Sequence, residues 1–335
     1  MLKVIADQAA IKKYTRQFAG KFRPFIDEKI KVKLGHQGAS YPAKVFWSKK
    51  LGIWIFSSAI KEIRYWNAFG VGRPKPGELV SITSEINFPW SGIDRKTGGA
   101  FARDTRGNIF VIHRGKIGGG KKGIGKSLFE HNYRGTWSFM EDGDDVTQVA
   151  VVGALTSVRF AQQAAQFVKK IEILKSSAVR TAQTQFDFPE ITFRENMAGN
   201  LPQADEPDIQ AECDRDLVIS SLASILKRWK FKIGNDENNE LFIVETNINR
   251  ISHVFEFITD TAEKNILAAA ARVLLQAATQ EENPLPILVL PEEKLNKYTQ
   301  ILQKIKIETV GFHLEEDRIV FHDLGKIKLD QNPQL

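Results

Sequence analysis

A polar segment at residues 177–210 constrains the fold more than any other feature of the chain, because it interrupts the apolar patterning on both of its sides. It contains three prolines and no sustained helical or strand periodicity, which is typical of a linker. The chain has 335 residues, and at roughly 100–200 residues per domain this length suits two domains. We therefore expect a first domain at residues 1–178, a linker at 179–210 and a second domain at 211–335.

The net charge changes sign across this segment. Residues 1–180 contain 31 lysines and arginines against 14 aspartates and glutamates, a net charge of +17, whereas residues 181–335 contain 16 against 26, a net charge of −10. A strongly positive domain raises the local concentration of polyanions. The predicted partner is therefore a nucleic acid, with double-stranded DNA as the first choice. The alternative is that the positive charge only forms a solvated surface.

Several classes of protein are excluded by what the sequence lacks. No run of about 18 apolar residues occurs, and the N-terminus has neither the long apolar stretch nor the cleavage site of a secretory signal. Cys213 is the only cysteine, so neither an intrachain disulfide nor a cysteine-based zinc site can form. We expect a cytoplasmic globular protein that does not enter the membrane.

The first domain is predicted to be mainly β with flanking helices. Apolar residues recur at helical spacing in residues 5–18 and 156–175. Stretches rich in β-branched and aromatic residues, separated by Gly, Pro and Ser, predict strands at residues 29–34, 43–47, 53–57, 62–66, 79–86, 108–113, 136–140 and 146–152. These strands are not separated by helices, which argues against a doubly wound parallel sheet.

A basic stretch at residues 95–134 is the predicted nucleic-acid-binding region of this domain. Its glycines allow backbone N–H groups to approach phosphates closely, and its cations supply charge and bidentate donors. The candidate binding residues are Arg95, Lys96, Arg103, Arg106, Arg114, Lys116, Lys121, Lys122 and Lys126. His113 precedes the glycine-rich part, where it either contacts phosphate or, as we favour, is an ordinary strand-end histidine.

Residues 120–127 also match the nucleotide-binding pattern G-x-x-x-x-G-K-[ST]. In that interpretation the backbone cradles the phosphates, Lys126 reaches the terminal ones and Ser127 ligates Mg²⁺. The pattern requires a strand directly before it and a helix directly after it. Seven residues separate it from the preceding strand, and the following sequence is a poor apolar helix. We therefore favour a phosphate-tracking loop over nucleotide hydrolysis.

The second domain has a regular order of predicted elements. Helices are predicted at residues 217–229, 262–279 and 292–306, and strands at 230–233, 240–246, 253–259, 286–290, 309–313 and 318–321. The text KFKIGNDENNELFIVETNINRISHVFEFITD, together with this order, resembles the PD-(D/E)XK nuclease superfamily, whose core is αβββαβ. The resulting fold class is a two-domain α+β or α/β protein, with a basic β-rich domain followed by a PD-(D/E)XK-like domain.

The resemblance implies a set of site residues. In that family two carboxylates hold Mg²⁺ against the scissile phosphate and a lysine orients the attacking water. Carried over by position, the metal-binding acids are Glu240, with Asp236 and Glu237 as substitutes, and Glu256. The lysine position is Ile258, which can neither donate a hydrogen bond nor carry charge. Either the site is lost, or Lys264 supplies the charge from a shifted position as a third catalytic residue. The helix that follows carries Arg272 and Gln276.

Three functions remain open from the sequence. The first is a DNA-binding protein with a nuclease-like domain and a degraded or atypical Mg²⁺ site, organised like restriction, defence or mobile-element endonucleases. The second is a non-enzymatic DNA-binding or assembly protein, in which helix 262–279 supplies a face for a homodimer or a protein partner. The third is a nucleotide-dependent enzyme that uses Lys126. The six histidines show no metal-binding spacing in sequence.

Overall fold

The structure is a computed structural model that describes residues 1–36, 38–118, 124–181, 208–235, 241–245, 250–280, 283–316 and 318–326. The chain is a mixed α+β protein and divides into two compact units. Unit 1 comprises Met1–Tyr133, Trp137–Thr156 and Phe167–Ile209, and unit 2 comprises Arg134–Thr136, Ser157–Gln166 and Gln210–Leu335. No helix in the described residues is long and apolar enough to cross a membrane.

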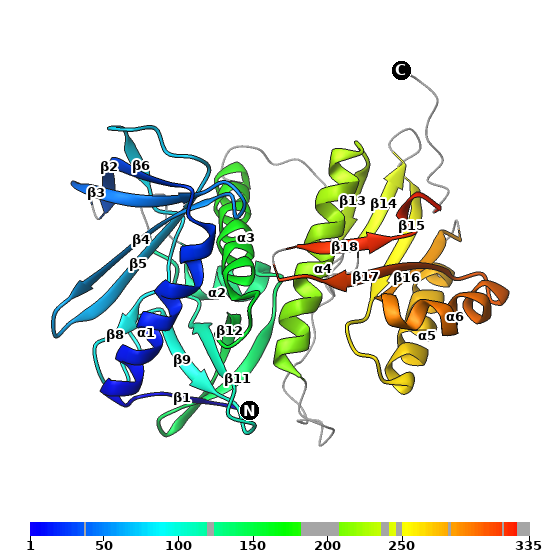
Figure 1. Ribbon diagram of the computed structural model, residues 1–335, viewed down its shortest axis with the longest axis horizontal. Helices are drawn as coiled ribbons and strands as arrows, with labels where there is room; N and C mark the ends of the chain where they lie inside the picture. Colours follow the sequence, from blue (N-terminus) through cyan, green and yellow to red (C-terminus); the bar gives the residue numbers. More distant parts are fainter. Residues whose placement is uncertain are drawn as a thin grey trace. The chain divides into compact units, whose positions relative to one another are not determined.

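Unit 1 contains a closed barrel of five short strands (Figure 1). Around the barrel the order is β1-β11-β12-β10-β9, in which β1 is parallel to β11 and every other pairing is antiparallel. The run IFVIH of β10 is buried at every position, as expected for a strand covered on both faces. The strands are β1 (Leu2–Val4), β9 (Gly99–Arg103), β10 (Ile109–His113), β11 (Trp137–Asp142) and β12 (Asp145–Ala154).

A second sheet of unit 1 has the order β6-β2-β3-β4-β5-β7, with β8 also pairing with β5. Strand β2 alternates between buried apolar and exposed polar residues over Lys29–Leu34, which is the pattern of a strand with one solvated face. The strands are β2 (Glu28–His36), β3 (Ala39–Ser48), β4 (Ile53–Ile60), β5 (Arg64–Val71), β6 (Leu79–Ser81), β7 (Ser84–Glu85) and β8 (Phe88–Pro89).

The helices of unit 1 begin where the sequence supplies caps or apolar faces. In α1 (Gln8–Phe22) the Asp7 side chain accepts a hydrogen bond from the Ala10 backbone N–H at 2.7 Å, which satisfies one free helix donor. Phe18 and Phe22 are buried on the same face of this helix. The remaining helical elements are η1 (Arg23–Phe25), α2 (Lys126–Asn132) and α3 (Phe160–Thr181), whose first turns belong to unit 2.

Unit 2 is built on a six-stranded mixed sheet of order β13-β14-β15-β16-β17-β18. Strands β15, β16 and β17 are mutually parallel, and the pairings toward both edges are antiparallel. The elements are α4 (Ile209–Arg228), β13 (Lys232–Asn235), β14 (Leu241–Glu245), β15 (Arg250–Phe257), α5 (Glu263–Thr279), β16 (Leu285–Pro291), α6 (Glu292–Lys304), β17 (Glu308–Leu314), β18 (Ile319–His322) and η2 (Leu324–Lys326).

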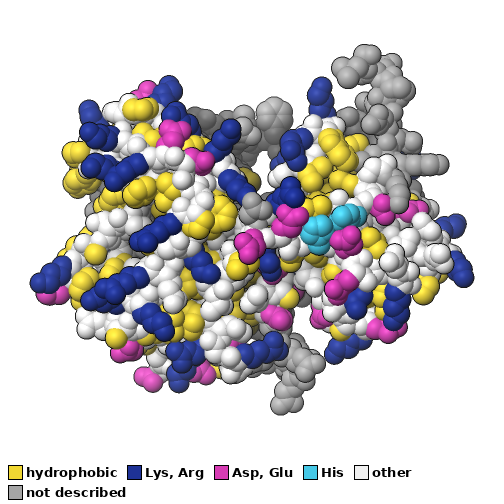
Figure 2. Space-filling model, viewed as in Figure 1, with side chains coloured by type: hydrophobic (Ala, Val, Ile, Leu, Met, Phe, Trp, Pro, Cys, Tyr) yellow, Lys and Arg dark blue, Asp and Glu magenta, His cyan; other side chains and the backbone are white. Residues whose placement is uncertain are grey.

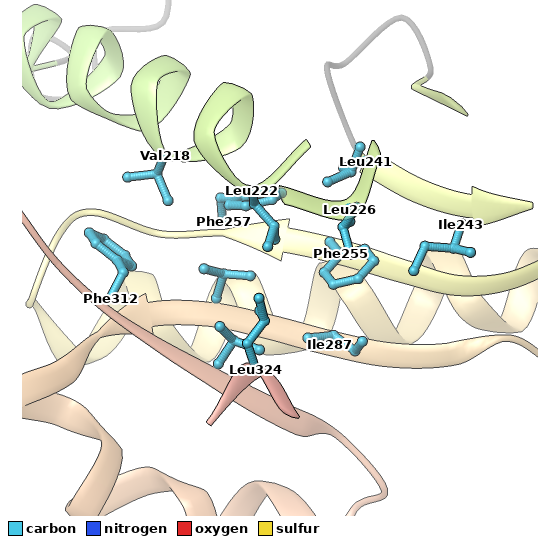
Figure 3. Close-up of a cluster of buried hydrophobic side chains, with 12 residues drawn as sticks. Val218, Leu222, Leu226, Leu241, Ile243, Phe255, Phe257, Ile287, Phe312 and Leu324 are labelled. Atoms are coloured by element: carbon cyan, nitrogen blue, oxygen red, sulfur yellow. The ribbon is translucent and has the colours of Figure 1, made fainter. Parts of the chain in front are cut away.

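Two apolar layers cover the faces of this sheet. Val218, Leu222 and Leu226 of α4 point onto Phe255 and Phe257 of β15 in Figure 3. On the other face, α5 and α6 pack through residues such as Ile266, Val273 and Leu302. Alternate strand residues therefore face different helices, which is the packing that a sheet buried on both sides requires.

The element order α4-β13-β14-β15-α5-β16 is the αβββαβ order that was expected for residues 211–335. An order of elements is shared among unrelated proteins, so it describes the fold and does not identify a family. The first helix begins at Ile209 and not at residue 217, because Ile209 and Cys213 extend its buried side by two turns. Strands β1 and β9 were not predicted, since three to five residues carry too little periodicity.

Candidate functional site

The solvated face of β2 carries a row of lysines. Lys29, Lys31 and Lys33 are exposed, and the apolar residues between and after them are buried. Side chains alternate between the two faces of a strand, so the three ammonium groups project from one face about 7 Å apart. The short sequence KIKVKL therefore both anchors the strand in the core and places three positive charges in solvent.

Strand β3 adds a fourth lysine to the same face. Lys44 lies directly opposite Lys31 in the antiparallel pair, and Phe46 lies opposite Lys29. The Lys29 ammonium lies 5.4 Å from the centre of the Phe46 ring, a cation–π distance. Lysine and arginine side chains are seen over the β2–β3 part of unit 1 in Figure 2. We call Lys29, Lys31, Lys33 and Lys44 the lysine face.

The lysine face forms no ion pair among the residues that the structure describes, although Glu28 and Glu78 flank it along the chain and across the sheet. Among the described residues, none of its four ammonium groups lies within 4.0 Å of a carboxylate. The only acidic residue in β2 and β3 is Glu28, and Arg73 engages it at 2.7 Å. Like charges placed directly opposite each other destabilise an antiparallel pair. The lysine face therefore combines a local energetic cost with an open cationic surface.

Within the predicted basic stretch at residues 95–134, Arg114 forms an ion pair inside the protein. The Nε and Nη2 atoms of Arg114 donate to the two carboxylate oxygens of Asp142 at 3.0 and 2.8 Å. The Arg114 side chain is 10% exposed and that of Asp142 is 2% exposed. The guanidinium of Arg114 neutralises a buried carboxylate and ties the end of β10 to β11, so this pairing does not favour the predicted nucleic-acid contact at Arg114.

Three further cations of that stretch have acidic partners on the surface. Arg95 lies 2.7 Å from Asp145, Arg106 lies 3.6 Å from Asp208, and Lys126 lies 3.5 Å from Glu130. These exposed pairs are weak and leave the cations accessible. The other candidates divide into Lys96, Arg103 and Lys116, which are exposed, and Lys121 and Lys122, which lie outside the described residues.

The glycine-rich loop is anchored at both of its ends. Ile117 and Ile124 form an antiparallel bridge. The buried Lys175 on α3 donates to the Gly118 carbonyl at 2.9 Å. Strand β10 before the loop is antiparallel to both of its neighbours, β9 and β12. Helix α2 does begin at Lys126, although the sequence there was expected to be a poor helix. A nucleotide-binding P-loop also follows a strand of a parallel βαβ unit, and the antiparallel β10 does not meet that requirement, so the surroundings of Lys126 do not favour nucleotide hydrolysis.

His113 is a core residue and not a phosphate contact. Its ring is buried, with Nε2 3.1 Å from the Glu85 carbonyl, and Nδ1 accepts from the Gly115 backbone N–H at 3.0 Å. The acceptor role of Nδ1 places the ring proton on Nε2. Burial lowers the pKa of His113 to about 4, because a charged ring would lose its hydration.

The acid Glu256 of the nuclease-like unit is held by arginines. It lies on β15 with its side chain 3% exposed, and Arg272 of α5 donates to Oε1 from Nε and Nη2 at 3.0 and 2.8 Å. Arg215 of α4 lies 3.8 Å from Oε2 and donates to the Phe257 carbonyl. The structure thus places two positive groups where the resemblance implies a metal ion.

The other implied catalytic residues do not complete a metal site with Glu256. Ile258 is buried in the apolar layer with Val254 and Ile266. Lys264 is exposed on α5, eight residues before Arg272 and so about 12 Å from it along the helix axis. Glu240, like Asp236 and Glu237, lies outside the described residues. Mg²⁺ binds carboxylates and waters. In the part of the chain that the structure describes, Glu256 shares its surroundings with Glu212, Arg215 and Arg272, and two guanidinium groups beside these carboxylates do not favour that ion.

Comparisons of this chain with protein-family models, with curated proteins and with solved structures found no match. The function must therefore be inferred from the geometry alone. The lysine face was not predicted, although its signal is present in the sequence as K-x-K-x-K inside a predicted strand. The local density of charge at residues 95–134 was the stronger pattern, but part of that charge is consumed by ion pairs with Asp142 and Asp145.

Proposed function

We propose that this protein binds nucleic acid, with double-stranded DNA as the preferred form, and that the lysine face is the contact surface. The observation that carries the proposal is the pair Lys31 and Lys44, which lie opposite each other on adjacent strands and, among the described residues, have no carboxylate within 4.0 Å of their ammonium groups. A polyphosphate backbone laid across these strands relieves the repulsion and releases counterions.

The chemistry of the lysine face favours the phosphate backbone over the bases. An ammonium group is a compact charge with freely rotating donors, whereas base reading in the major groove is typically done by planar bidentate groups such as that of arginine. Contacts to phosphates position a protein on the duplex and carry no sequence information. The proposed activity is therefore binding with little dependence on sequence and a steep dependence on salt.

For the second unit we propose a binding or assembly role without phosphodiester hydrolysis. Glu256 is already neutralised by Arg272 and Arg215, so recruiting a metal ion there would require breaking a buried ion pair. Supercoiled DNA incubated with the protein and Mg²⁺ or Mn²⁺ should remain uncut. Cleavage that disappears in the variant Glu256→Ala would restore the endonuclease hypothesis.

The lysine face is tested by neutralising it. The variant Lys29→Gln/Lys31→Gln/Lys33→Gln/Lys44→Gln removes four positive charges from one surface. Each phosphate contact contributes about 0.9 to the slope of log K against log salt on duplex DNA. We therefore expect the slope, measured by fluorescence anisotropy with a labelled duplex between about 50 and 200 mM salt, to fall by up to about 4 units.

A matched control removes the same charge elsewhere in unit 1. Lys12, Lys13, Lys49 and Lys61 are also exposed, and their quadruple change to Gln gives the same net charge. We expect this control to change the slope by less than about 1 unit. An equal loss in both variants would mean that only the net charge matters, and a wild-type chain that ignores DNA at low salt would end the proposal.

A further inference from the structure

Three side chains from separate elements of unit 2 converge on one point of its surface. Glu292 opens α6, His313 lies on β17 and His322 ends β18. His313 Nδ1 lies 2.8 Å from Glu292 Oε2 and 2.9 Å from His322 Nε2, and His322 Nε2 lies 3.2 Å from the same carboxylate oxygen. One atom of each side chain therefore faces a common centre.

The fold of the hairpin and helix explains this convergence. In the β17–β18 pair, His322 lies opposite Gly311 and His313 lies opposite Val320. The two histidines are therefore diagonal neighbours on one face of the hairpin. A Cβ on Gly311 would lie 2.3 Å from Leu295 Cδ1 of α6. The absence of a side chain at Gly311 thus lets α6 approach this face, and Glu292, at its start, reaches both rings.

We propose that Glu292, His313 and His322 bind a divalent transition-metal ion of the Zn²⁺ class. Two imidazole nitrogens and a carboxylate oxygen are ligands that such ions prefer. Bonds of about 2.0–2.1 Å in a tetrahedral site separate the ligand atoms by about 3.3 Å, close to the three distances observed. Three protein ligands leave a fourth position for water.

A neighbouring carboxylate supports this ligand set. Glu315 lies 3.3 Å from His313 Nε2 and is itself held by Arg318. A proton on Nε2 lets His313 donate to Glu315, and the lone pair of Nδ1 then points toward Glu292 and His322. Histidines that bind metals commonly donate their second N–H to a carboxylate or carbonyl in this way, which fixes the ring and increases its basicity.

The site is accessible from solvent and lies outside the residues assigned to DNA binding. Figure 2 shows histidine side chains at the surface of unit 2 with acidic side chains around them. The competing arrangement has no metal, with a protonated His313 between the carboxylates of Glu292 and Glu315. Both arrangements use the same residues, so metal titration distinguishes them.

The test is titration of the metal-free full-length chain with Zn²⁺ by calorimetry and native mass spectrometry. We expect one bound equivalent, lost or weakened at least tenfold in Glu292→Gln and in His322→Asn. Glu315→Gln should weaken binding by about 10–100-fold, as is typical for such outer partners. Co²⁺ provides a second readout, since its visible absorption reports coordination by nitrogen and oxygen.

The matched control is Glu293→Gln, which removes a carboxylate from the next residue of the same helix. This control should bind Zn²⁺ like the wild type, and circular dichroism should show that all variants are folded. Absence of a stoichiometric Zn²⁺ complex would overturn the proposal. So would equal affinities of the wild type, Glu292→Gln and His322→Asn, or a loss in Glu293→Gln as large as that in Glu292→Gln. Each of these results is independent of DNA binding.

Discussion

Glu256 carries a negative charge on a buried strand, and the partners of that charge decide its role. A buried carboxylate must be paired, because removing it from water costs several kcal/mol. Arg272 reaches it from α5 and Arg215 from α4, so this charge links both helical layers to β15. The same carboxylate beside a second acid and an open groove would attract a cation from solution. Here the protein supplies the cations itself.

Removing the charge of Glu256 should destabilise unit 2 without changing any DNA cleavage. Glu256→Gln removes the carboxylate that accepts two hydrogen bonds from Arg272. Because the Arg272 side chain is 53% exposed, we expect a loss of about 1–3 kcal/mol, the range for a hydrogen bond to a charged group. We expect a lower urea midpoint for the unfolding of unit 2. Circular dichroism and hydrogen exchange of the β15 amides measure this change.

The control for this prediction is the exposed pair of Glu263 and Lys297, whose atoms lie 3.2 Å apart on the surface. Glu263→Gln should change the free energy of unfolding by less than about 0.5 kcal/mol, since exposed ion pairs contribute little. Equal stabilities of Glu256→Gln and the wild type would contradict a structural role for Glu256.

At the residue scale, the sequence predicted where side chains lie along the chain but not which partners they meet. The strand carrying Glu256 and the helix carrying Arg272 were both predicted by periodicity. Their contact joins residues 16 positions apart, and the contact of Arg114 with Asp142 joins residues 28 apart. Such pairings depend on tertiary packing, which periodicity does not contain.

At the scale of elements, β2 and β3 show that a strand can be well patterned and still be locally unfavourable. Buried Ile30, Val32 and Leu34 pack β2 against the core. Its outer face carries three lysines, of which Lys31 lies opposite Lys44. A sheet selected for stability alone would place an acidic residue opposite Lys31. The retained repulsion is the kind of cost that functional surfaces carry.

Placing an acid at position 44 should therefore change stability and binding in opposite directions. Lys44→Glu creates an opposite-charge pair with Lys31, and such cross-strand pairs contribute about 0.2–1 kcal/mol. We expect a higher urea midpoint for unit 1 together with a several-fold weaker affinity for duplex DNA at low salt. Lys12→Glu on α1 is the control with the same charge change. If the variant is stabilised but binds DNA with the affinity of the wild type, the lysine face is not the DNA interface.

The elements themselves were predicted unevenly. The alternation in β2 and the helical spacing in α5 and α6 were sufficient to place these elements. The register that sets Lys31 opposite Lys44, and His313 diagonal to His322, follows from hairpin geometry and core packing. For that reason both surfaces on which functions are proposed were missed, although every residue in them was visible in the sequence.

At the scale of the whole molecule, the division of the chain does not follow the predicted boundaries. Residues Ser157–Gln166 belong to unit 2, although they precede the polar segment by more than ten residues. The reason is a buried cluster on Asp214 of α4, whose carboxylate accepts from Arg159 at 3.0 and 2.6 Å and from Gln163 at 3.0 Å. The composition of the chain changes at residues 177–210. The contacts of Ser157–Gln166, however, determine that these residues belong to unit 2.

Because Arg159 and Gln163 complete unit 2, a fragment that starts inside the predicted linker at 179–210 should be less stable than one that includes them. Fragment 157–335 retains both donors to Asp214, whereas fragment 208–335 leaves that carboxylate without the guanidinium of Arg159 and the amide of Gln163. We expect the free energy of unfolding of fragment 208–335 to be lower by about 3 kcal/mol, within the range for a broken buried ion pair.

Urea unfolding followed by circular dichroism measures this difference, and Arg159→Met in fragment 157–335 is the decisive comparison. If the ion pair with Asp214 accounts for the difference, this single change should remove most of it while leaving α3 itself unchanged. Equal stability of the two fragments would mean that unit 2 is complete from residue 208 onward, and the sequence boundary would then be the physical one.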